Sequence, residues 1–162
     1  MTHKQSVALV PGSFDPITLG HLHIIERACQ AYDVVYVAVM INDAKTYRYT
    51  MEQREEMVAL AVAKLPNVRV VSSNGMLWEL ARDLDACAIV KGVRNDTDRE
   101  YEEKMAEYNA RAYPNAKTVL LECTQGLDQV SSTEVRNRLD ANLPIEHLVP
   151  KVIIQKLQNL NT

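Results

Sequence analysis

The chain has 162 residues, a formal net charge of −3 and 47% hydrophobic residues, which is typical of one globular domain spanning residues 1–162. The slightly acidic balance argues against a nucleic-acid partner, because such a protein needs a basic face. The longest apolar run, Val34 to Ile41, is far shorter than the roughly 18 residues that span a membrane. Because the net charge is slightly negative, any anion site must be a local concentration of positive groups.

The three cysteines are Cys29, Cys87 and Cys123, which are widely spaced and form no CxxC pair. This pattern argues against a disulfide framework and against a zinc site. Cys87 lies in an apolar run, so we expect its side chain to be buried. A reducing cytoplasmic location fits this cysteine usage, and the short polar start from Met1 to Ser6 predicts no signal peptide.

Hydrophobic runs and helical patterns alternate along the chain. In chain order we expect strand Val7–Val10, helix Leu19–Ala31, strand Val34–Ile41, a helix from Thr50 to Leu65, strand Val68–Val71, helix Met76–Leu84, strand Ala86–Val90, helix Asp96–Tyr113, strand Thr118–Leu121, and helices Ser131–Leu139 and Pro150–Leu160. The strand runs are almost continuously apolar, as in strands buried on both faces of a parallel sheet. The pattern predicts an α/β fold, a Rossmann-like doubly wound five-stranded parallel sheet with helices on both faces.

Ligands of such sheets bind beyond the carboxyl ends of the strands, so the segments that follow the strands carry the candidate site. The segment Pro11–His21 follows the first strand and contains neither a GxGxxG nor a GxxxxGK[ST] pattern. It does join a glycine-containing turn to a helix start, where free N–H groups bind anions. His21 falls in the first turn of that helix, although a lone histidine there is more often a surface residue.

Cations and hydroxyls follow the other strands. Lys45 follows the second strand, and Lys91 and Arg94 follow the fourth; each alone could be a solvated charge. Ser131 and Glu134 have the spacing of a capping box, at a helix start that can also hold phosphates. The residues expected on one rim of the sheet are Ser13, His21, Lys45, Lys91, Arg94 and Ser131 to Thr133. We see no conspicuous cluster of protein metal ligands beside them, so the sequence predicts a polyphosphate site.

Two segments resemble signatures of the nucleotidylyltransferase superfamily. Thr18-x-Gly20-His21 is similar to its (H/T)xGH signature, and Val130–Arg136 is similar to its (I/V)SSTxxR signature. From about Val7 to Leu157 the chain most resembles the phosphopantetheine adenylyltransferase family, through these segments, Thr50–Arg54 and Lys91–Glu102. The resemblance implies an enzyme that uses ATP, 4'-phosphopantetheine and Mg²⁺ and releases dephospho-coenzyme A and pyrophosphate.

The resemblance also implies roles for individual residues. His21 would stabilise the transition state at the α-phosphate, and Lys45 and Arg94 would join it in catalysis. The implied ATP site consists of Ser13, Phe14, His21, Gly92, Val93, Arg94, Glu102, Leu127, Asp128, Gln129, Val130, Ser131, Ser132 and Thr133. The implied phosphopantetheine site consists of Ser13, Lys45, Leu77 and Lys91. The chain departs from the family at position 91, where Lys replaces the usual Arg, and at Arg99, which replaces a usual aromatic residue.

The family further implies a cytoplasmic homo-oligomer, commonly a hexamer, and coenzyme A as a feedback ligand. One alternative is a sister activity, such as nicotinamide mononucleotide adenylyltransferase or a cytidylyltransferase, which shares the fold and the first signature. Another alternative is a nucleotide-sensing module without catalytic activity. Such a module would be expected to lose His21 or the cations, but this chain has both. The acceptor phosphate is itself a nucleophile, so we expect in-line displacement by positioning and charge stabilisation, without a general base.

Overall fold

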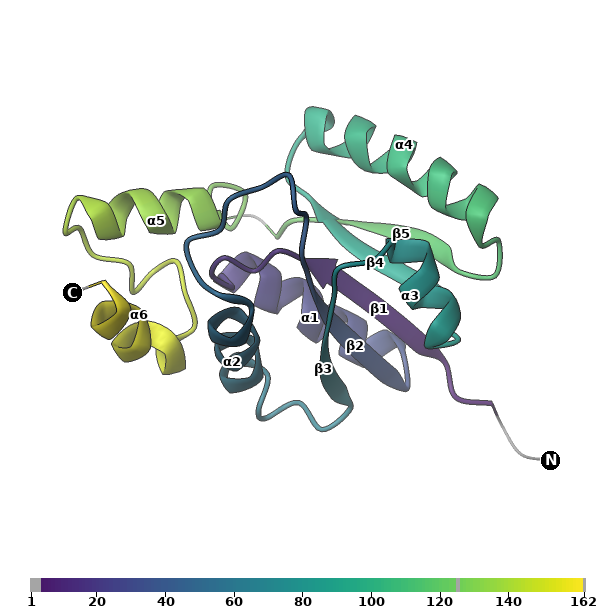
Figure 1. Cartoon of the computed structure of the whole chain (residues 1–162), viewed down its shortest axis with the longest axis horizontal. Helices are drawn as coiled ribbons and strands as arrows, with labels where there is room; N and C mark the ends of the chain where they lie inside the picture. Colours follow the sequence, from purple (N-terminus) through teal and green to yellow (C-terminus); the bar gives the residue numbers. More distant parts are fainter. Residues whose placement is uncertain (1–3, 125, 162) are drawn as a thin grey trace.

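The computed structural model describes residues 4–124 and 126–161. Five parallel strands form one sheet in the order β3-β2-β1-β4-β5, and Figure 1 shows them between layers of helices. The strands are β1 Val7–Gly12, β2 Val34–Met40, β3 Val68–Ser73, β4 Ala88–Val93 and β5 Lys117–Glu122. The helices are α1 Leu19–Ala31, α2 Met51–Ala61, α3 Leu77–Asp83, α4 Asp96–Ala112, α5 Ser132–Asp140, the 3₁₀ turn η1 Lys151–Ile153, and α6 Ile154–Leu160. The predicted doubly wound five-stranded sheet is confirmed.

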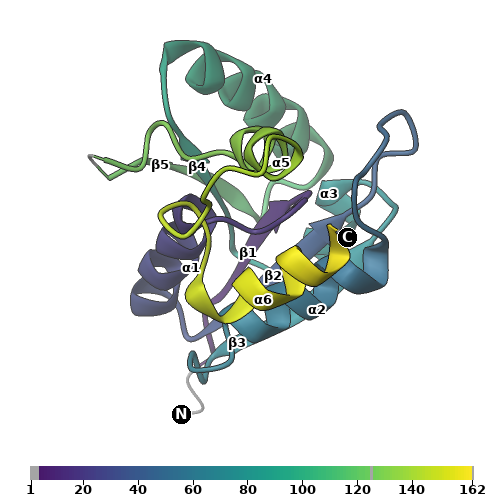
Figure 2. The same ribbon diagram turned by 90° about the vertical axis from the view of Figure 1, so that its left-hand side faces the viewer.

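The strand order places a crevice at one point of the sheet. The chain begins at the central strand β1, proceeds through β2 to the edge strand β3, and then crosses back to β4 and β5. The order therefore reverses between β1 and β4, and this is where open α/β sheets bind ligands. Figure 2 views the molecule from the side on which α5 and α6 lie, close to the carboxyl ends of the strands.

Two apolar clusters cover the two faces of the sheet. On one face, helices α1 and α2 pack on the strands, and apolar residues of α5 and α6 join the same cluster, in which Ile25, Met57 and Leu157 are completely buried. The cluster on the other face is smaller and includes Leu9 from β1 and Ala81 from α3. Helices on both faces were predicted, and the structure confirms them.

The prediction that all five strands are buried on both faces is wrong for the edges. The edge strands β3 and β5 contain partly exposed and exposed residues throughout, whereas β2 and β4 are mostly buried and half of the residues of β1 are buried. An edge strand has a neighbour on one side only, so solvent reaches it. Cys87 is also exposed, contrary to expectation. It precedes β4 by one residue, at the amino end of the strand, and its side chain faces solvent although Ala86 and Ala88 on either side are buried.

Four strands, β1, β3, β4 and β5, extend further than the hydrophobic runs indicate. β1 continues through Gly12, which pairs with Val39 of β2, and β4 continues through Val93, which pairs with Glu122 of β5. Lys91 and Gly92 therefore lie within β4 rather than after it. Gly92 has a packing reason to lack a side chain, because a Cβ there would lie 3.0 Å from Cγ1 of Ile24 in α1.

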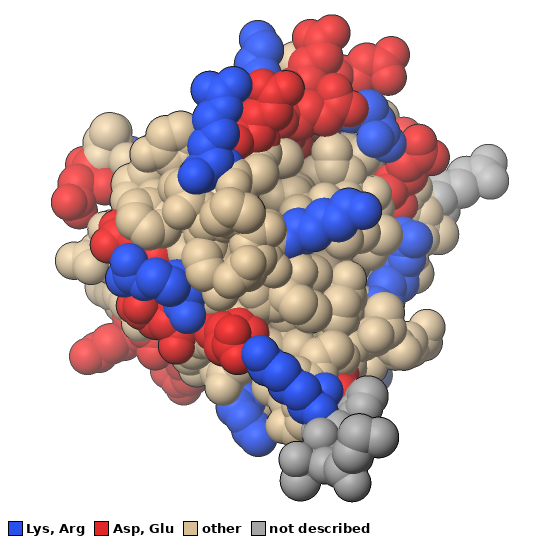
Figure 3. Space-filling model, turned by 90° about the vertical axis from the view of Figure 1, so that its right-hand side faces the viewer, with Lys and Arg blue, Asp and Glu red and all other residues tan. Residues whose placement is uncertain are grey.

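The surface carries both signs of charge. Positive and negative side chains are interspersed on the face in Figure 3, and acidic ones gather at its top, where α4 lies. This distribution agrees with the net charge of −3 and provides no broad basic face in that view. None of the helices among the described residues is both long and apolar enough to cross a membrane.

Candidate active site

A cavity of about 350 Å³ opens at the carboxyl ends of β1 and β4, at the reversal of strand order. Helices α1, α4 and α5 each contribute residues to its wall. It is lined by Val10, Pro11, Gly12, Phe14, Thr18, Gly20, His21, Ile24, Val90, Lys91, Gly92, Arg94, Asp98, Glu102, Cys123, Val130, Ser131, Ser132 and Thr133. Its volume lies in the range of small-molecule sites, which is about 300–1,000 Å³.

His21 is part of the cap that starts α1. The backbone N–H of Thr18 donates to Nδ1 of His21 over 3.0 Å, and the backbone N–H of His21 donates to Oγ1 of Thr18 over 3.3 Å. This is a capping box in which a histidine occupies the position usually held by Glu or Gln. Because a backbone N–H can only donate, Nδ1 carries no proton, and the proton of the neutral ring sits on Nε2.

The environment keeps His21 neutral. Burial, together with the positive charge of Arg94, lowers the pKa of His21 from 6.5 to about 4. Near neutral pH the ring is thus an uncharged hydrogen-bond donor through Nε2, suited to stabilise negative charge that develops on a bound group.

The turn between β1 and α1 is tight and is formed around Phe14. Phe14 adopts a positive φ of 50°, a conformation that is uncommon for a bulky residue. A Cβ on Gly12 would lie 3.0 Å from the ring of Phe14, so glycine at position 12 makes room for that ring. The ring also meets the imidazole of His21 edge-on, with 5.0 Å between centroids. The strained turn therefore positions the histidine.

Helix α4 supplies a carboxylate to each cation of the cavity. Nζ of Lys91 lies 2.7 Å from Oε2 of Glu102, and Nε of Arg94 lies 3.1 Å from Oδ2 of Asp98. Asp98 and Glu102 are four residues apart on the helix, so they point in the same direction. The role of Asp98 was not predicted, although its position four residues after Arg94 was the signal that could have identified it.

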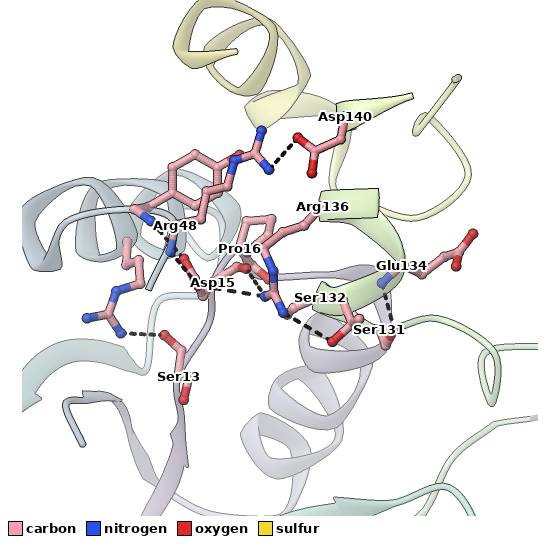
Figure 4. Close-up of polar contacts among 12 residues, drawn as sticks. Ser13, Asp15, Pro16, Arg48, Ser131, Ser132, Glu134, Arg136 and Asp140 are labelled. Carbon is pink, nitrogen blue, oxygen red and sulfur yellow. Dashed lines mark hydrogen bonds and ion pairs between the residues drawn. The ribbon is translucent and has the colours of Figure 1, made fainter. Parts of the chain in front are cut away.

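A network centred on Asp15 joins three distant segments, as Figure 4 shows. Asp15 is 4% exposed, and its carboxylate accepts hydrogen bonds from the backbone N–H groups of Arg48 and Tyr49, at 2.9 and 3.0 Å. Nη1 of Arg136, in α5, donates to the carbonyl of Asp15 over 2.7 Å and lies 3.7 Å from its carboxylate. Asp15 therefore links the turn after β1 with the segment before α2 and with α5.

Two further side chains complete the attachment of these segments. Oγ of Ser132 donates to the carbonyl of Pro16 over 2.7 Å. Arg54, in α2, is 2% exposed and donates through Nη1 to the carbonyls of Ser13 and Met40, at 2.9 and 3.2 Å. These bonds hold the ends of β1 and β2 and the start of α5 in one arrangement.

The start of α5 presents its first turn to the cavity. The side chain of Ser131 accepts a hydrogen bond from the backbone N–H of Glu134 over 3.0 Å, which confirms the predicted cap. The first N–H groups of a helix have no partner within the helix and form a positive end that binds anions. Ser131, Ser132 and Thr133 line the cavity at this end.

The structure gathers most, but not all, of the predicted site residues. Phe14, His21, Lys91, Gly92, Arg94, Glu102, Val130, Ser131, Ser132 and Thr133 line the cavity. Ser13, Lys45, Leu77, Val93, Leu127, Asp128 and Gln129 are not among its lining residues. Lys45 is exposed in the segment between β2 and α2, whereas Val93 is 3% exposed within β4. Their predicted ligand contacts remain predictions.

Sequence reasoning did not assign roles to Thr18, Asp15, Arg136 or Cys123. The spacing of Thr18 and His21 matches a capping box and could have indicated their mutual bonds. No comparable local signal links Asp15 to Arg136, because they are far apart in the chain. Cys123 lines the cavity, and burial raises the pKa of its thiol.

Comparisons with known proteins place the chain among nucleotidyltransferases. Residues 9–138 match the cytidylyltransferase-like family. Proteins called phosphopantetheine adenylyltransferase from Streptococcus equi subsp. equi and Clostridium perfringens are 38% and 40% identical to the chain over 156 and 152 residues. These alignments cover 96% and 94% of this chain and 94% and 93% of those proteins.

A solved structure shows the same fold at low sequence identity. The lipopolysaccharide core biosynthesis protein from Thermoplasma volcanium superposes with a TM-score of 0.55 at 16% identity. The superposition covers 75% of this chain and 98% of that protein. The similarity is evidence of a shared fold and of nothing more specific.

Replacement of Asp15 should destabilise the protein. In Asp15→Asn an amide NH₂ faces one of the two backbone donors, and the charge beside Arg136 is lost. We expect the free energy of unfolding to fall by about 1–3 kcal/mol, the effect of leaving a buried donor unsatisfied. Urea denaturation measures it, with Asp43→Asn at an exposed position as the control, expected within about 0.5 kcal/mol of wild type. Equal stability of Asp15→Asn and the control would contradict the role given to this network.

His21 should make stability depend on pH in the acid range. Its pKa is about 4 in the folded protein and about 6.5 in the unfolded chain, so the unfolded state binds more protons between these values. Stability from this residue is therefore present above pH 6.5 and is lost as the pH falls towards 4. His21→Gln keeps an acceptor for the cap but does not titrate. Over this pH range its unfolding free energy should therefore fall by about 1–3 kcal/mol less than that of the wild type.

Urea unfolding at several pH values tests this difference, with the exposed His147→Gln as the control. The control should follow the wild-type curve. If His21→Gln also declines in parallel with wild type, the low pKa assigned to His21 is wrong.

Proposed function

The chain belongs to the phosphopantetheine adenylyltransferase family of cytidylyltransferase-like nucleotidyltransferases, and on this basis we propose that it transfers the adenylyl group of ATP to 4'-phosphopantetheine. The products are dephospho-coenzyme A and pyrophosphate, in a reversible step of coenzyme A biosynthesis. The observation that carries the proposal is a neutral His21 with its proton on Nε2. It lines one cavity together with Lys91, Arg94 and the start of α5.

The proposed reaction is a direct displacement at the α-phosphorus of ATP. A phosphate oxygen of the acceptor forms the new bond to phosphorus, and the bond to the bridging oxygen of pyrophosphate breaks with its electron pair. The attacking oxygen is already ionised near neutral pH, so no protein group has to remove a proton. The protein contributes positioning and stabilisation of the charge on the reacting phosphate.

His21 is the residue that we place at the reacting phosphate. Its Nδ1 is held by the N–H of Thr18, so the ring cannot rotate without breaking the cap of α1. Nε2–H remains free to donate to an oxygen of the α-phosphate. A donor fixed in advance stabilises charge that increases in the transition state, because it needs no reorganisation at that moment.

The other groups of the cavity suit the remaining phosphates. We assign Arg94 and the first turn of α5, at Ser131 to Thr133, to the nucleotide, since a guanidinium and helix N–H groups both match phosphate oxygens. Lys91 is assigned to the phosphate of the acceptor. Lys45 is exposed and does not line the cavity, so its proposed contact requires the segment between β2 and α2 to approach the acceptor.

The remaining assignments follow the family resemblance. We propose that Ser13 and Phe14 contact ATP, that Ser13 also contacts the acceptor phosphate, and that Leu77 contacts the pantetheine arm. Gly92, Val93, Glu102 and residues 127–130 are assigned to the nucleotide. Support is strongest for Phe14, Gly92, Glu102 and Val130, which line the cavity.

We propose that Mg²⁺ enters with ATP. Within residues 4–124 and 126–161, no three or more His, Cys, Asp or Glu side chains are grouped so that they could hold a metal ion. The two carboxylates of the cavity, Asp98 and Glu102, are each paired with a cation. This arrangement fits an ion held mainly by phosphates and water, which would neutralise part of the phosphate charge when bound.

We further propose a cytoplasmic homo-oligomer, a hexamer by analogy with the family, with coenzyme A as a feedback ligand. Support for self-association comes from α4, where Tyr101 and Tyr108 are 61% and 49% exposed. They are seven residues apart and so share one face of the helix. Exposed aromatic residues are enriched at protein–protein interfaces, and sedimentation equilibrium would reveal a monomer if the proposal is wrong.

The reaction itself is the first test. The protein with ATP, Mg²⁺ and 4'-phosphopantetheine should release pyrophosphate and form dephospho-coenzyme A, measured by a coupled pyrophosphate assay and mass spectrometry. CTP replacing ATP, and nicotinamide mononucleotide replacing the acceptor, are the controls and should support little turnover. Efficient use of nicotinamide mononucleotide with no use of phosphopantetheine would contradict the proposed acceptor.

Loss of the imidazole should lower turnover far more than binding. His21→Ala removes the donor at the α-phosphate, and we expect kcat to fall about a hundred- to a thousandfold, as when one oxyanion donor is deleted. The Kd of ATP should change little, because the contact strengthens in the transition state. His21→Gln keeps an acceptor for the cap and should show the same loss. Turnover within about threefold of wild type in a folded, ATP-binding variant would refute this role.

A further inference from the structure

We propose that the Lys91–Glu102 ion pair couples the two substrates, so that binding of the acceptor raises the affinity for the nucleotide and the reverse. The inference rests on the proposed function above, in which Lys91 holds the acceptor phosphate and Glu102 lies beside the nucleotide. It adds a positioning role for Glu102, which acts on the acceptor through Lys91 and on the nucleotide directly.

The pair is short and largely shielded from water. Nζ of Lys91 lies 2.7 Å from Oε2 of Glu102, and the side chains are only 25% and 14% exposed. Lys91 comes from β4 and Glu102 from α4, and both line the cavity. A shielded pair is weakened less by solvent than a surface pair, so losing one partner matters more to the other.

Glu102 depends on this one cation. Its Oε2 is buried, and among the described residues the contact that compensates its charge there is the Lys91 ammonium, at 2.7 Å. A carboxylate can only accept hydrogen bonds, and a buried one without a partner is unfavourable. Anything that draws Lys91 away therefore leaves Glu102 in need of a donor.

Binding of the acceptor creates this need for a donor, and the nucleotide can satisfy it. An acceptor phosphate competes with Glu102 for the Lys91 ammonium, because both are anions. A nucleoside carries amino and hydroxyl donors, which can supply a hydrogen bond to the carboxylate that Lys91 has partly released. Bound acceptor thus makes the nucleotide contact more favourable, and linkage requires the nucleotide to favour the acceptor by the same factor.

The neighbouring pair Arg94–Asp98 provides an internal comparison. Its side chains are more exposed, at 40% and 28%, and Asp98 also accepts a hydrogen bond from the backbone N–H of Arg94 over 3.2 Å. Arginine has five donors, so it can keep Asp98 while it binds a phosphate. Asp98 lies one turn from Glu102 on the same helix, yet it should not couple the substrates.

The experiment measures the coupling factor by calorimetry. The Kd of α,β-methylene ATP, which cannot react, is determined with and without saturating 4'-phosphopantetheine. We expect the wild-type Kd to fall at least about fivefold when the acceptor is present. In Glu102→Gln, which has no charge to leave unpaired, the ratio should be close to one. Asp98→Asn is the matched control and should keep the wild-type ratio.

A second variant tests whether the first one acts through the ion pair or only by disturbing the structure. Lys91→Gln should also abolish the coupling, and the double variant should show no further change, because one contact carries the effect. Melting temperatures within about 3 °C of wild type would show that the fold is intact.

The outcomes separate this inference from the proposed function. A wild-type protein that releases pyrophosphate with phosphopantetheine but shows a ratio of one overturns the coupling and leaves the function standing. Persistent coupling in Glu102→Gln or Lys91→Gln, or its loss in Asp98→Asn alone, also overturns it. A wild-type protein that neither binds phosphopantetheine nor reacts with it overturns the proposed function and the coupling together.

Discussion

The arrangement of the site depends on one buried carboxylate. Asp15 is 4% exposed, and a buried charge is tolerated only when its hydrogen-bonding and charge requirements are met. Its partners come from the segment before α2, through the N–H groups of Arg48 and Tyr49, and from α5, through Arg136. Meeting the needs of this carboxylate brings the turn after β1 and the start of α5 together, and the cavity lies between them.

The same turn determines the chemistry available to His21. Its Nδ1 accepts from Thr18 and its ring contacts Phe14, so the histidine is held as a neutral donor. Arg94 adds to this effect, because its positive charge helps to keep the pKa of His21 low. Arg94 is in turn held by Asp98 from α4. The charges of the cavity therefore act on one another, because Asp98 holds Arg94 and Arg94 helps to keep His21 neutral.

Much of the fold could be predicted because hydrophobic periodicity is a local property. The apolar runs located all five strands, and the spacing of Thr50 and Gln53 correctly indicated the cap of α2. Errors arose where pairing or coverage by distant elements decides the outcome. β4 extends to Val93 because Glu122 pairs with it, and Cys87 is exposed although its neighbours in sequence are apolar.

The sequence by itself determined the fold class, the two signature segments and the presence of most cavity residues at the carboxyl ends of β1 and β4 and the start of α5. These features follow from interactions within a few residues and from the parallel direction of the strands. Only the tertiary structure decided that Lys91 pairs with Glu102, that Arg136 holds Asp15, and that Lys45 stays outside the cavity. Such contacts depend on how β4, α4 and α5 pack, and packing joins side chains whose separation along the chain carries no local signal.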